Sequence, residues 1–338
     1  MVQTYLRLQI YKHIFKAMQV EQNTQNNTSF PDWIPPRPEM SPLAQLGILL
    51  AFTGAGLVLA GIAQLVIMMA GIKDLSLTNL ETVILDPKNA FVVQLSQIAA
   101  SICLFVLPAF IFTKISRKKF SSYFHFDGKS PRQLWMLTIG IALTGILVSE
   151  GLGLLNEAIP LSPHLKTYFK HLEDNYSNQM SAMVQLNNLP EYLMAIFLVG
   201  LLPAICEELF FRGALQQIMV SWTRSAFGGI LITSVIFSAI HLSYYGFLPR
   251  FVLGMTLGYI FYYGKNIWLN ILVHFLNNAL AVTFMYIQLH RQHKPLKEVM
   301  NSTSGLDFYY IIIATLIFVY LFWKFKKESD IESPQINR

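Results

Sequence analysis

The stretch LVGLLPAICEELFFRGALQ, Leu198 to Gln216, is apolar enough to lie in a lipid bilayer, yet it carries Glu207, Glu208 and Arg212 near its middle. A charged side chain at the centre of a membrane helix costs about 2.5–3.5 kcal/mol by insertion scales. Charged residues at such a depth usually face one another or a water-filled cavity, and they mark functional sites. The stretch therefore predicts a membrane helix with a functional reason for its charges.

The composition of the whole chain also indicates a membrane protein. Of its 338 residues, 54% are hydrophobic and 13% are charged, whereas a soluble domain has about 25% charged residues. Apolar runs recur along the chain, and most approach the roughly 20 residues that a spanning helix needs. We therefore predict an all-α polytopic membrane protein with about eight transmembrane helices and its active site inside the helical core. The expected spans are Leu46–Ala70, Ala90–Phe112, Leu134–Leu155, Tyr192–Phe211, Ala226–Ile240, Phe247–Tyr263, Ile267–Leu289 and Phe308–Phe325.

The basic residues predict how these spans are oriented. If eight helices alternate in direction, most Lys and Arg side chains fall on one side, which the positive-inside rule assigns to the cytoplasm. Both termini are then cytoplasmic, and we place the protein in the cytoplasmic membrane of a bacterium. The net charge of +6 is dispersed among the loops and does not indicate nucleic-acid binding. The basic side holds Arg7, Lys12, Lys16, Arg37, Lys114, Arg117, Lys118, Lys119, Lys129, Arg132, Arg224, Lys265, Lys324, Lys326 and Lys327.

Segments outside the spans complete the predicted organisation. In residues 1–40, apolar side chains at helical spacing with basic residues between them indicate a cytoplasmic amphipathic helix, which a polar linker follows. Residues 41–325 are the expected transmembrane helical domain, and residues 326–338 are a solvated cytoplasmic tail. The long outer segment Glu157–Pro190 is a candidate cover for the entrance to a cavity.

The charges of the opening stretch divide into a pair and a single acid. Residues four apart share a helix face, so Glu208 and Arg212 are expected to pair. Glu207 lies about 100° away around the helix axis and cannot use Arg212 in the same way. Pro203, one turn before Glu207, removes a backbone hydrogen bond and tends to open the helix. Glu207 is therefore the carboxylate that needs another explanation.

Two later spans carry polar residues at the same spacing. FSAIH places Phe237 four residues before His241, and HFLNN places His274 four residues before Asn278. Polar side chains can simply hold membrane helices together, at about 0.6 kcal/mol per hydrogen bond, and this interpretation stays open for His274 with Asn278. Packing does not require an acid beside imidazoles, however. An unpaired Glu207 with two histidines available to it favours a functional cavity.

The three motifs EELFFR, FSAIH and HFLNN, in this order, resemble those of the CAAX protease and bacteriocin-processing family of intramembrane endopeptidases. That family has a Glu-Glu pair with Arg four residues after the second Glu, then Phe and His four apart, then His and Asn four apart. Each motif alone is weak, but the three in this order on separate predicted helices are specific. The resemblance covers a core of about residues 191–288 and implies a helical membrane endopeptidase that cleaves peptide bonds near the cytoplasmic leaflet.

Carried over residue by residue, the resemblance implies a role for each position. Glu207 with His241 would activate the attacking water, and His274 with Asn278 would stabilise the oxyanion of the tetrahedral intermediate. An oxyanion donor of this kind is worth about 3 kcal/mol in other acyl-transfer sites. The positions that support the site correspond to Glu208, Arg212 and Phe237.

A bound metal is the alternative to this scheme. Carboxylate and imidazole are usual zinc ligands, so Glu207, His241 and His274 would be the ligands if the protein used zinc. The sequence lacks the compact H-E-x-x-H zinc helix. We favour no cofactor, with zinc as the alternative.

Two functions of other classes use the same residue types. A proton-coupled transporter also places Glu and His inside the membrane, but such proteins often contain inverted repeats, and no repeat is apparent in this sequence. A non-catalytic membrane scaffold or immunity protein would hold a partner through its helices, and the intact motifs argue against it. As partners we expect a peptide or lipidated protein substrate and membrane lipid, and no nucleic acid.

Overall fold

The structure, a computed structural model, describes residues 40–332 apart from short gaps. The gaps are residues 74, 77, 118, 293–295 and 297–306. The predicted amphipathic helix and linker therefore lie outside the described residues, as does the end of the predicted tail from residue 333 onward. The described helices belong to the unit that begins at Ser41.

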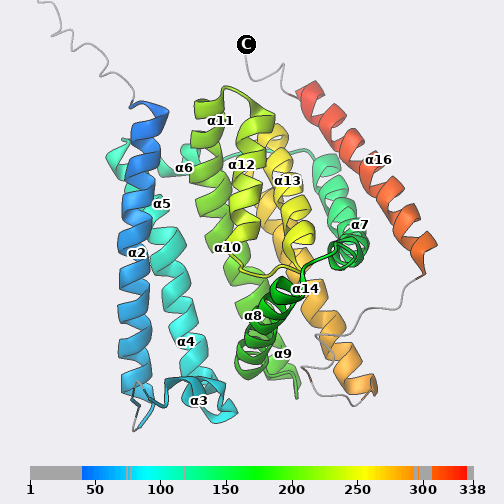
Figure 1. Ribbon diagram of the computed structural model, residues 1–338. Helices are drawn as coiled ribbons and strands as arrows, with labels where there is room; N and C mark the ends of the chain where they lie inside the picture. The colour runs from blue at the N-terminus through cyan, green and yellow to red at the C-terminus, as the bar shows by residue number, and fades with distance from the viewer. Residues whose placement is uncertain are drawn as a thin grey trace, which may run out of the picture. The chain divides into compact units, whose positions relative to one another are not determined.

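Every regular element in the described part of the chain is helical, which confirms the predicted all-α class (Figure 1). The α-helices are α2 (Pro42–Gly71), α3 (Leu80–Leu85), α4 (Ala90–Ser101), α5 (Leu107–Ile115), α6 (Phe120–Tyr123), α7 (Arg132–Glu157), α8 (Pro163–Met183), α9 (Leu189–Ala195), α10 (Leu202–Glu208), α11 (Gln217–Thr223), α12 (Ala226–Ala239), α13 (Phe247–Gly264), α14 (Ile267–Gln292) and α16 (Phe308–Glu332). The shorter helical segments that join or precede them are η1 (Pro87–Asn89), η2 (Ile102–Val106), η3 (Ile196–Leu201) and η4 (Leu209–Gln216).

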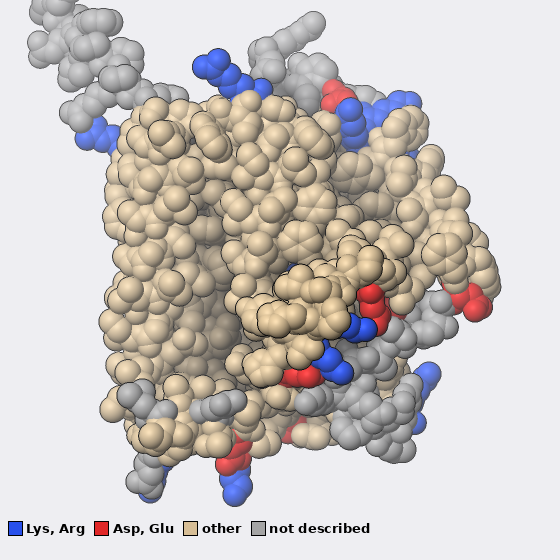
Figure 2. All heavy atoms as spheres, in the orientation of Figure 1, with Lys and Arg blue, Asp and Glu red and all other residues tan. Residues whose placement is uncertain are grey.

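In the part of the chain that the structure describes, six helical stretches are long and apolar enough to cross a membrane, which implies a multi-pass membrane protein. Their outer faces expose large apolar side chains, such as Leu57 on α2 and Leu316 on α16, as lipid contact favours. Figure 2 shows an uncharged band over α2, with Lys and Arg side chains toward its two ends. The six stretches are Pro42–Gly71, Pro87–Ile115, Arg132–Glu157, Leu189–Thr223, Ile267–Arg291 and Phe308–Asp330.

The predicted count of about eight spans is not shown, because α12 and α13 are not among the six. The 14 residues of α12 rise by about 21 Å at 1.5 Å per residue, which is less than the roughly 30 Å of the hydrocarbon core. Figure 1 shows both helices between α11 and α7, and α12 packs on α11 while α13 packs on α7. Neighbouring helices therefore cover much of their surface, which relaxes the need for a long apolar run.

Two of the six spans are interrupted by π-helical segments. Ile102–Val106 lies in the second span, while Ile196–Leu201 and Leu209–Gln216 lie on either side of α10 in the fourth. Single π turns in α-helices often occur at functional sites, because they change the direction of the side chains that follow. Pro203 stands at the start of α10 and cannot donate the bond that the Val199 carbonyl would accept in a regular helix. The regular α-helical pattern of this span is therefore interrupted next to Pro203, as the proline predicts.

Helix α8 occupies most of the predicted outer segment. Ser162 caps it by accepting a backbone N–H, and Pro163 takes the first helical position, where a missing N–H leaves no bond unmade. The helix contacts α3 and α4. Ser243, in the connection between α12 and α13, donates a hydrogen bond of 2.8 Å to Glu173 of α8. The segment is thus tied to the connection that follows α12, the helix that carries the FSAIH motif.

Close packing of α11 and α12 gives a testable consequence for stability. A Cβ added at Gly229 would overlap the backbone nitrogen and Cα of Val220, and backbone atoms cannot rotate away. We expect Gly229→Ala to destabilise the protein by about 1–3 kcal/mol, the usual cost of overpacking. Gly61→Ala on α2 is the control, because nothing lies within 4 Å of its added carbon. Thermal unfolding in detergent compares them, and equal midpoints would contradict the close approach.

Candidate active site

The predicted ion pair between Glu208 and Arg212 is confirmed. Nη1 of Arg212 donates to Oε1 of Glu208 over 2.9 Å, and both side chains are fully buried. Nη2 of Arg212 donates to the backbone carbonyl of Gly254 on α13 over 3.3 Å. The guanidinium also lies 4.6 Å from the centre of the Phe237 ring, a distance at which a cation is attracted to the ring face. Phe237 thus packs against the charge that balances Glu208.

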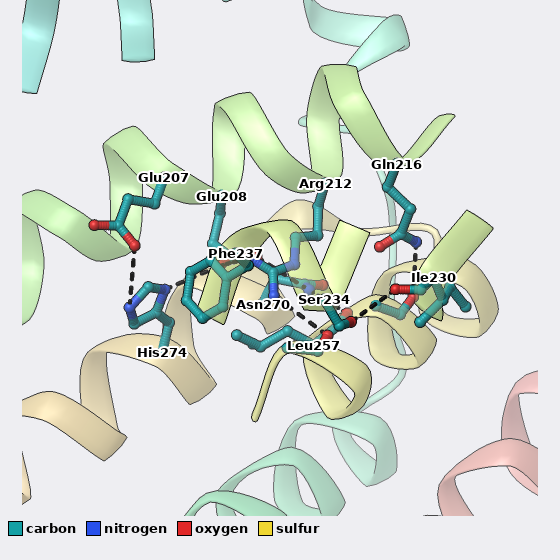
Figure 3. A network of polar contacts seen from close by, with 12 residues as sticks. Glu207, Glu208, Arg212, Gln216, Ile230, Ser234, Phe237, Leu257, Asn270 and His274 are labelled. Carbon is teal, nitrogen blue, oxygen red and sulfur yellow. Dashed lines mark hydrogen bonds and ion pairs between the residues drawn. The ribbon is translucent and has the colours of Figure 1, made fainter. Parts of the chain in front are cut away.

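His274 joins this pair from α14. Its Nδ1 lies 2.9 Å from Oε1 of Glu208. A carboxylate paired with Arg212 can only accept, so Nδ1–H of His274 is the donor. The other ring nitrogen, Nε2, then faces Glu207, whose Oε2 lies 3.9 Å away. Figure 3 shows the imidazole between the two carboxylates, with Glu207 and Glu208 leaving the helix in different directions.

Glu207 differs from its neighbour in its surroundings. Its Oε2 has no hydrogen-bond partner among the described residues, and its side chain keeps 13% of its exposure, against 0% for Glu208. Two hydrogen bonds of about 2.8 Å can meet at one water, so a single water fits within reach of Glu207 Oε2 and His274 Nε2. The prediction that Glu207 stands apart from the Glu208–Arg212 pair is confirmed.

His241 and Asn278 lie on other walls of the site. Nδ1 of His241 lies 2.7 Å from the backbone carbonyl of Phe237, so Nδ1–H donates and Nε2 keeps its lone pair. No hydrogen bond or ion pair joins His241 to Glu207 in the described structure. Nδ2 of Asn278 donates to the Val199 carbonyl over 3.0 Å, which is the carbonyl that the proline at 203 leaves without its regular helical donor.

A cavity of about 450 Å³ brings most of these side chains together. Glu207, His241, His274 and Asn278 all line it, and so does Phe237. Glu208 and Arg212 are not in its lining and stand behind the wall. Tyr176, Met180 and Met183 of α8 form part of the lining, in agreement with the expectation that the outer segment covers a cavity. Figure 2 shows this face hollowed between α4 and α8.

Comparison with known protein families identifies the part of the chain that carries this site. Residues 189–280 match the family model described as Type II CAAX prenyl endopeptidase Rce1-like. These residues are a domain of that protease family. The Rce1-like domain runs from the start of α9 into α14 and contains all three motifs, which confirms the resemblance and lies close to the core expected at about residues 191–288. No curated protein matches the chain, and no solved structure does.

The residues of the Rce1-like domain do not gather as a set of metal ligands. Within the described residues, no three His, Cys, Asp or Glu side chains are grouped closely enough to hold a metal ion. Nδ1 of His274 is engaged by Glu208, and Nδ1 of His241 is engaged by a backbone carbonyl. Each imidazole therefore presents only Nε2 to the cavity, which Glu207, His241 and His274 all line.

Three polar residues of the site were not predicted from the sequence. Nδ2 of Asn270 donates to the Leu257 carbonyl over 2.6 Å and lies 3.4 Å from Oε2 of Glu208. Nε2 of Gln216 donates to the Gly258 carbonyl over 2.9 Å. Arg250 lines the cavity. Spacing would have indicated the first two, because Asn270 lies four residues before His274 and Gln216 four residues after Arg212.

Proposed function

We propose that this protein is an intramembrane endopeptidase that hydrolyses a peptide bond of a membrane-associated or lipidated protein, or of a leader peptide. The observation that carries the proposal is the asymmetry of two neighbouring carboxylates. Glu208 is engaged by Arg212 and His274, whereas Glu207 lines the cavity and its Oε2 has no hydrogen-bond partner among the described residues. A positioned carboxylate with a free oxygen is suited to take a proton from an attacking water.

In the proposed mechanism, Glu207 and His241 activate the water. Nε2 of His241 retains its lone pair because Nδ1–H donates to the Phe237 carbonyl, so the ring can accept a proton on the side that faces the cavity. Glu207 is the stronger candidate for the first transfer, since a water that contacts its Oε2 also lies within reach of His274. Proton transfer to a positioned base contributes roughly 10²- to 10⁴-fold to a rate.

The oxyanion is stabilised by His274 and Asn278 in this mechanism. Since Nδ1–H of His274 donates to Glu208, Nε2 becomes a donor only after it takes up a proton, which Glu207 can pass to it once Glu207 has accepted the proton of the attacking water. Glu208 fixes the orientation of the ring by accepting from Nδ1–H, as the buried acid of a Ser-His-Asp triad does for its imidazole. Asn278 uses one N–H of its amide on the Val199 carbonyl and retains the other for the substrate.

We further propose that α12 and α13 complete an eight-helix topology in the cytoplasmic membrane of a bacterium, with both termini cytoplasmic. Figure 1 shows α2 beginning at the end of the helices where α16 finishes. The start of α2 and the end of α16 therefore lie on the same side of the membrane, whether α12 and α13 cross the bilayer as a pair or turn back within it. The basic loop that precedes α7 and the lysines of α16, Lys324, Lys326 and Lys327, favour the cytoplasm for that side.

The proposal is tested with purified protein and its Glu207→Gln variant in detergent. Both are incubated with soluble, lipidated and membrane-segment peptides, and mass spectrometry identifies the new termini. Cuts by the wild-type protein that the variant does not make are the expected result. Absence of cuts by the wild-type protein from all three peptide classes would contradict an endopeptidase. Proton flux in liposomes that persists in the variant would favour a transporter, and full cellular function of the variant would favour a scaffold.

A further inference from the structure

Arg250, near the start of α13, is a cation of the cavity that the mechanism does not use. It lines the cavity that also holds Glu207 and His241. Its Nη1 is buried without a hydrogen-bond partner, and no ion pair of Arg250 is found among the residues that the structure describes. Its guanidinium lies 5.9 Å from the centre of the Tyr176 ring on α8. These features leave its N–H donors available to a ligand.

The local packing holds the guanidinium in this place. A Cβ at Gly246 would overlap Nη1 of Arg250, so the missing side chain at Gly246 is what makes room for it. The neighbouring lining is largely apolar, with Met180, Met183 and Leu253. An N–H donor buried among such groups without a partner is costly, and an anionic ligand would remove that cost.

The two arginines near the site contrast with each other. Arg212 lies outside the cavity lining and forms an ion pair with Glu208 at 2.9 Å. Its charge is therefore balanced within the protein and does not face the cavity. Arg250 lies in the lining, where the carboxylate of Glu207 forms no ion pair with it in the described structure. The cavity therefore offers a separate anion for chemistry and a separate cation. A planar guanidinium matches a carboxylate through two parallel hydrogen bonds.

We propose that Arg250 binds a carboxylate of the substrate and so selects which peptide bond Glu207 reaches. This inference rests on the proposed endopeptidase function. The carboxylate is either the free C-terminus of the substrate or an acidic side chain close to the scissile bond, since both present the same group to the guanidinium. In either case the apolar lining contributed by α8 accommodates the neighbouring side chains.

Peptide binding tests the proposal apart from turnover. In the Glu207→Gln background, fluorescence anisotropy measures the Kd of one labelled apolar hexapeptide in three forms: free acid, C-terminal amide, and amide with a penultimate Asp. We expect at least one carboxylate form to bind about tenfold to hundredfold more tightly than the plain amide, the range for a hydrogen bond to a charged group. The form that is preferred identifies the source of the carboxylate.

Variants of the same background assign that preference to Arg250. Arg250→Gln is expected to bring the ratio of acid to amide affinity close to one, and Arg250→Lys is expected to keep part of it. Arg224→Gln, at an exposed arginine beyond the end of α11, is the control and keeps the full ratio. The preference persisting in a folded Arg250→Gln variant, or no preference in the parent, would overturn the proposal.

Turnover of the same peptides by the wild-type protein separates this inference from the function on which it rests. Cleavage of acid and amide forms alike, with no carboxylate preference in binding, would remove the role of Arg250 and leave the endopeptidase intact. A carboxylate preference that depends on Arg250, without cleavage of any form, would support the binding site and count against the peptidase.

Discussion

Replacing Glu207 by glutamine is expected to lower kcat for peptide cleavage by roughly 10²- to 10⁴-fold, because an amide cannot take the proton of the attacking water. The fold should be unaffected. Oε2 of Glu207 has no hydrogen-bond partner among the described residues, and its nearest ionic contact is His274 at 3.9 Å. Removing this charge from apolar surroundings leaves stability unchanged or raises it, as at many functional sites. Cleavage of a quenched fluorescent peptide and thermal unfolding measure the two effects.

The adjacent Glu208→Gln variant is the matched control. Its substitution leaves Arg212 buried without an anion and weakens the acceptor for His274, so stability should fall together with activity. The two variants are thus expected to differ: Glu207→Gln loses activity alone, whereas Glu208→Gln loses both stability and activity. Full turnover by a folded Glu207→Gln protein would contradict its assignment as the base.

Replacing Arg212 by methionine is expected to have the largest effect on stability, about 3–5 kcal/mol, the usual result of removing one partner of a buried ion pair. Arg212 and Glu208 are both 0% exposed, so water cannot replace the lost partner. The substitution also removes the hydrogen bond to the Gly254 carbonyl and the contact with the Phe237 ring. Unfolding with increasing SDS in mixed micelles gives the free-energy difference.

A double variant separates the charge from the packing. In Glu208→Gln with Arg212→Met, no uncompensated charge remains, so we expect the double variant to be more stable than the sum of the two single losses by at least about 1 kcal/mol. Losses that simply add would mean that the two side chains do not depend on each other. In that case the distance of 2.9 Å between them would not describe the folded protein.

The helices and the ion pair followed from the sequence because both depend on local spacing. An apolar run needs no partner to be recognised, and residues four apart lie on one face of any helix. The same rule separated Glu207 from the Glu208–Arg212 pair before its surroundings were known. Membership of the protease family was accessible for a similar reason, since its three motifs are short and ordered.

The parts that the sequence did not predict depend on contacts between distant segments. The predicted count of about eight spans is not shown, because α12 and α13 pack against α11 and α7 and are not among the six spanning stretches, and hydropathy does not distinguish lipid from neighbouring helices. Arg250 was not predicted because only the assembled cavity brings it into the same lining as Glu207 and leaves its Nη1 without a hydrogen-bond partner among the described residues. That His274 contacts Glu208 at 2.9 Å required knowing how α14 rotates against α10.

The proline of the fourth span affects more than the path of its own helix. Pro203 leaves the Val199 carbonyl without its regular donor, and Asn278 of α14 donates to it instead, at 3.0 Å. The orientation of a side chain on one helix thus depends on a bond that the backbone of another does not make. The alignment of α14 with the fourth span therefore depends on a backbone carbonyl that Pro203 leaves free for Asn278. A substitution at position 203 that restored the regular helical bond to Val199 would remove this contact between the two helices.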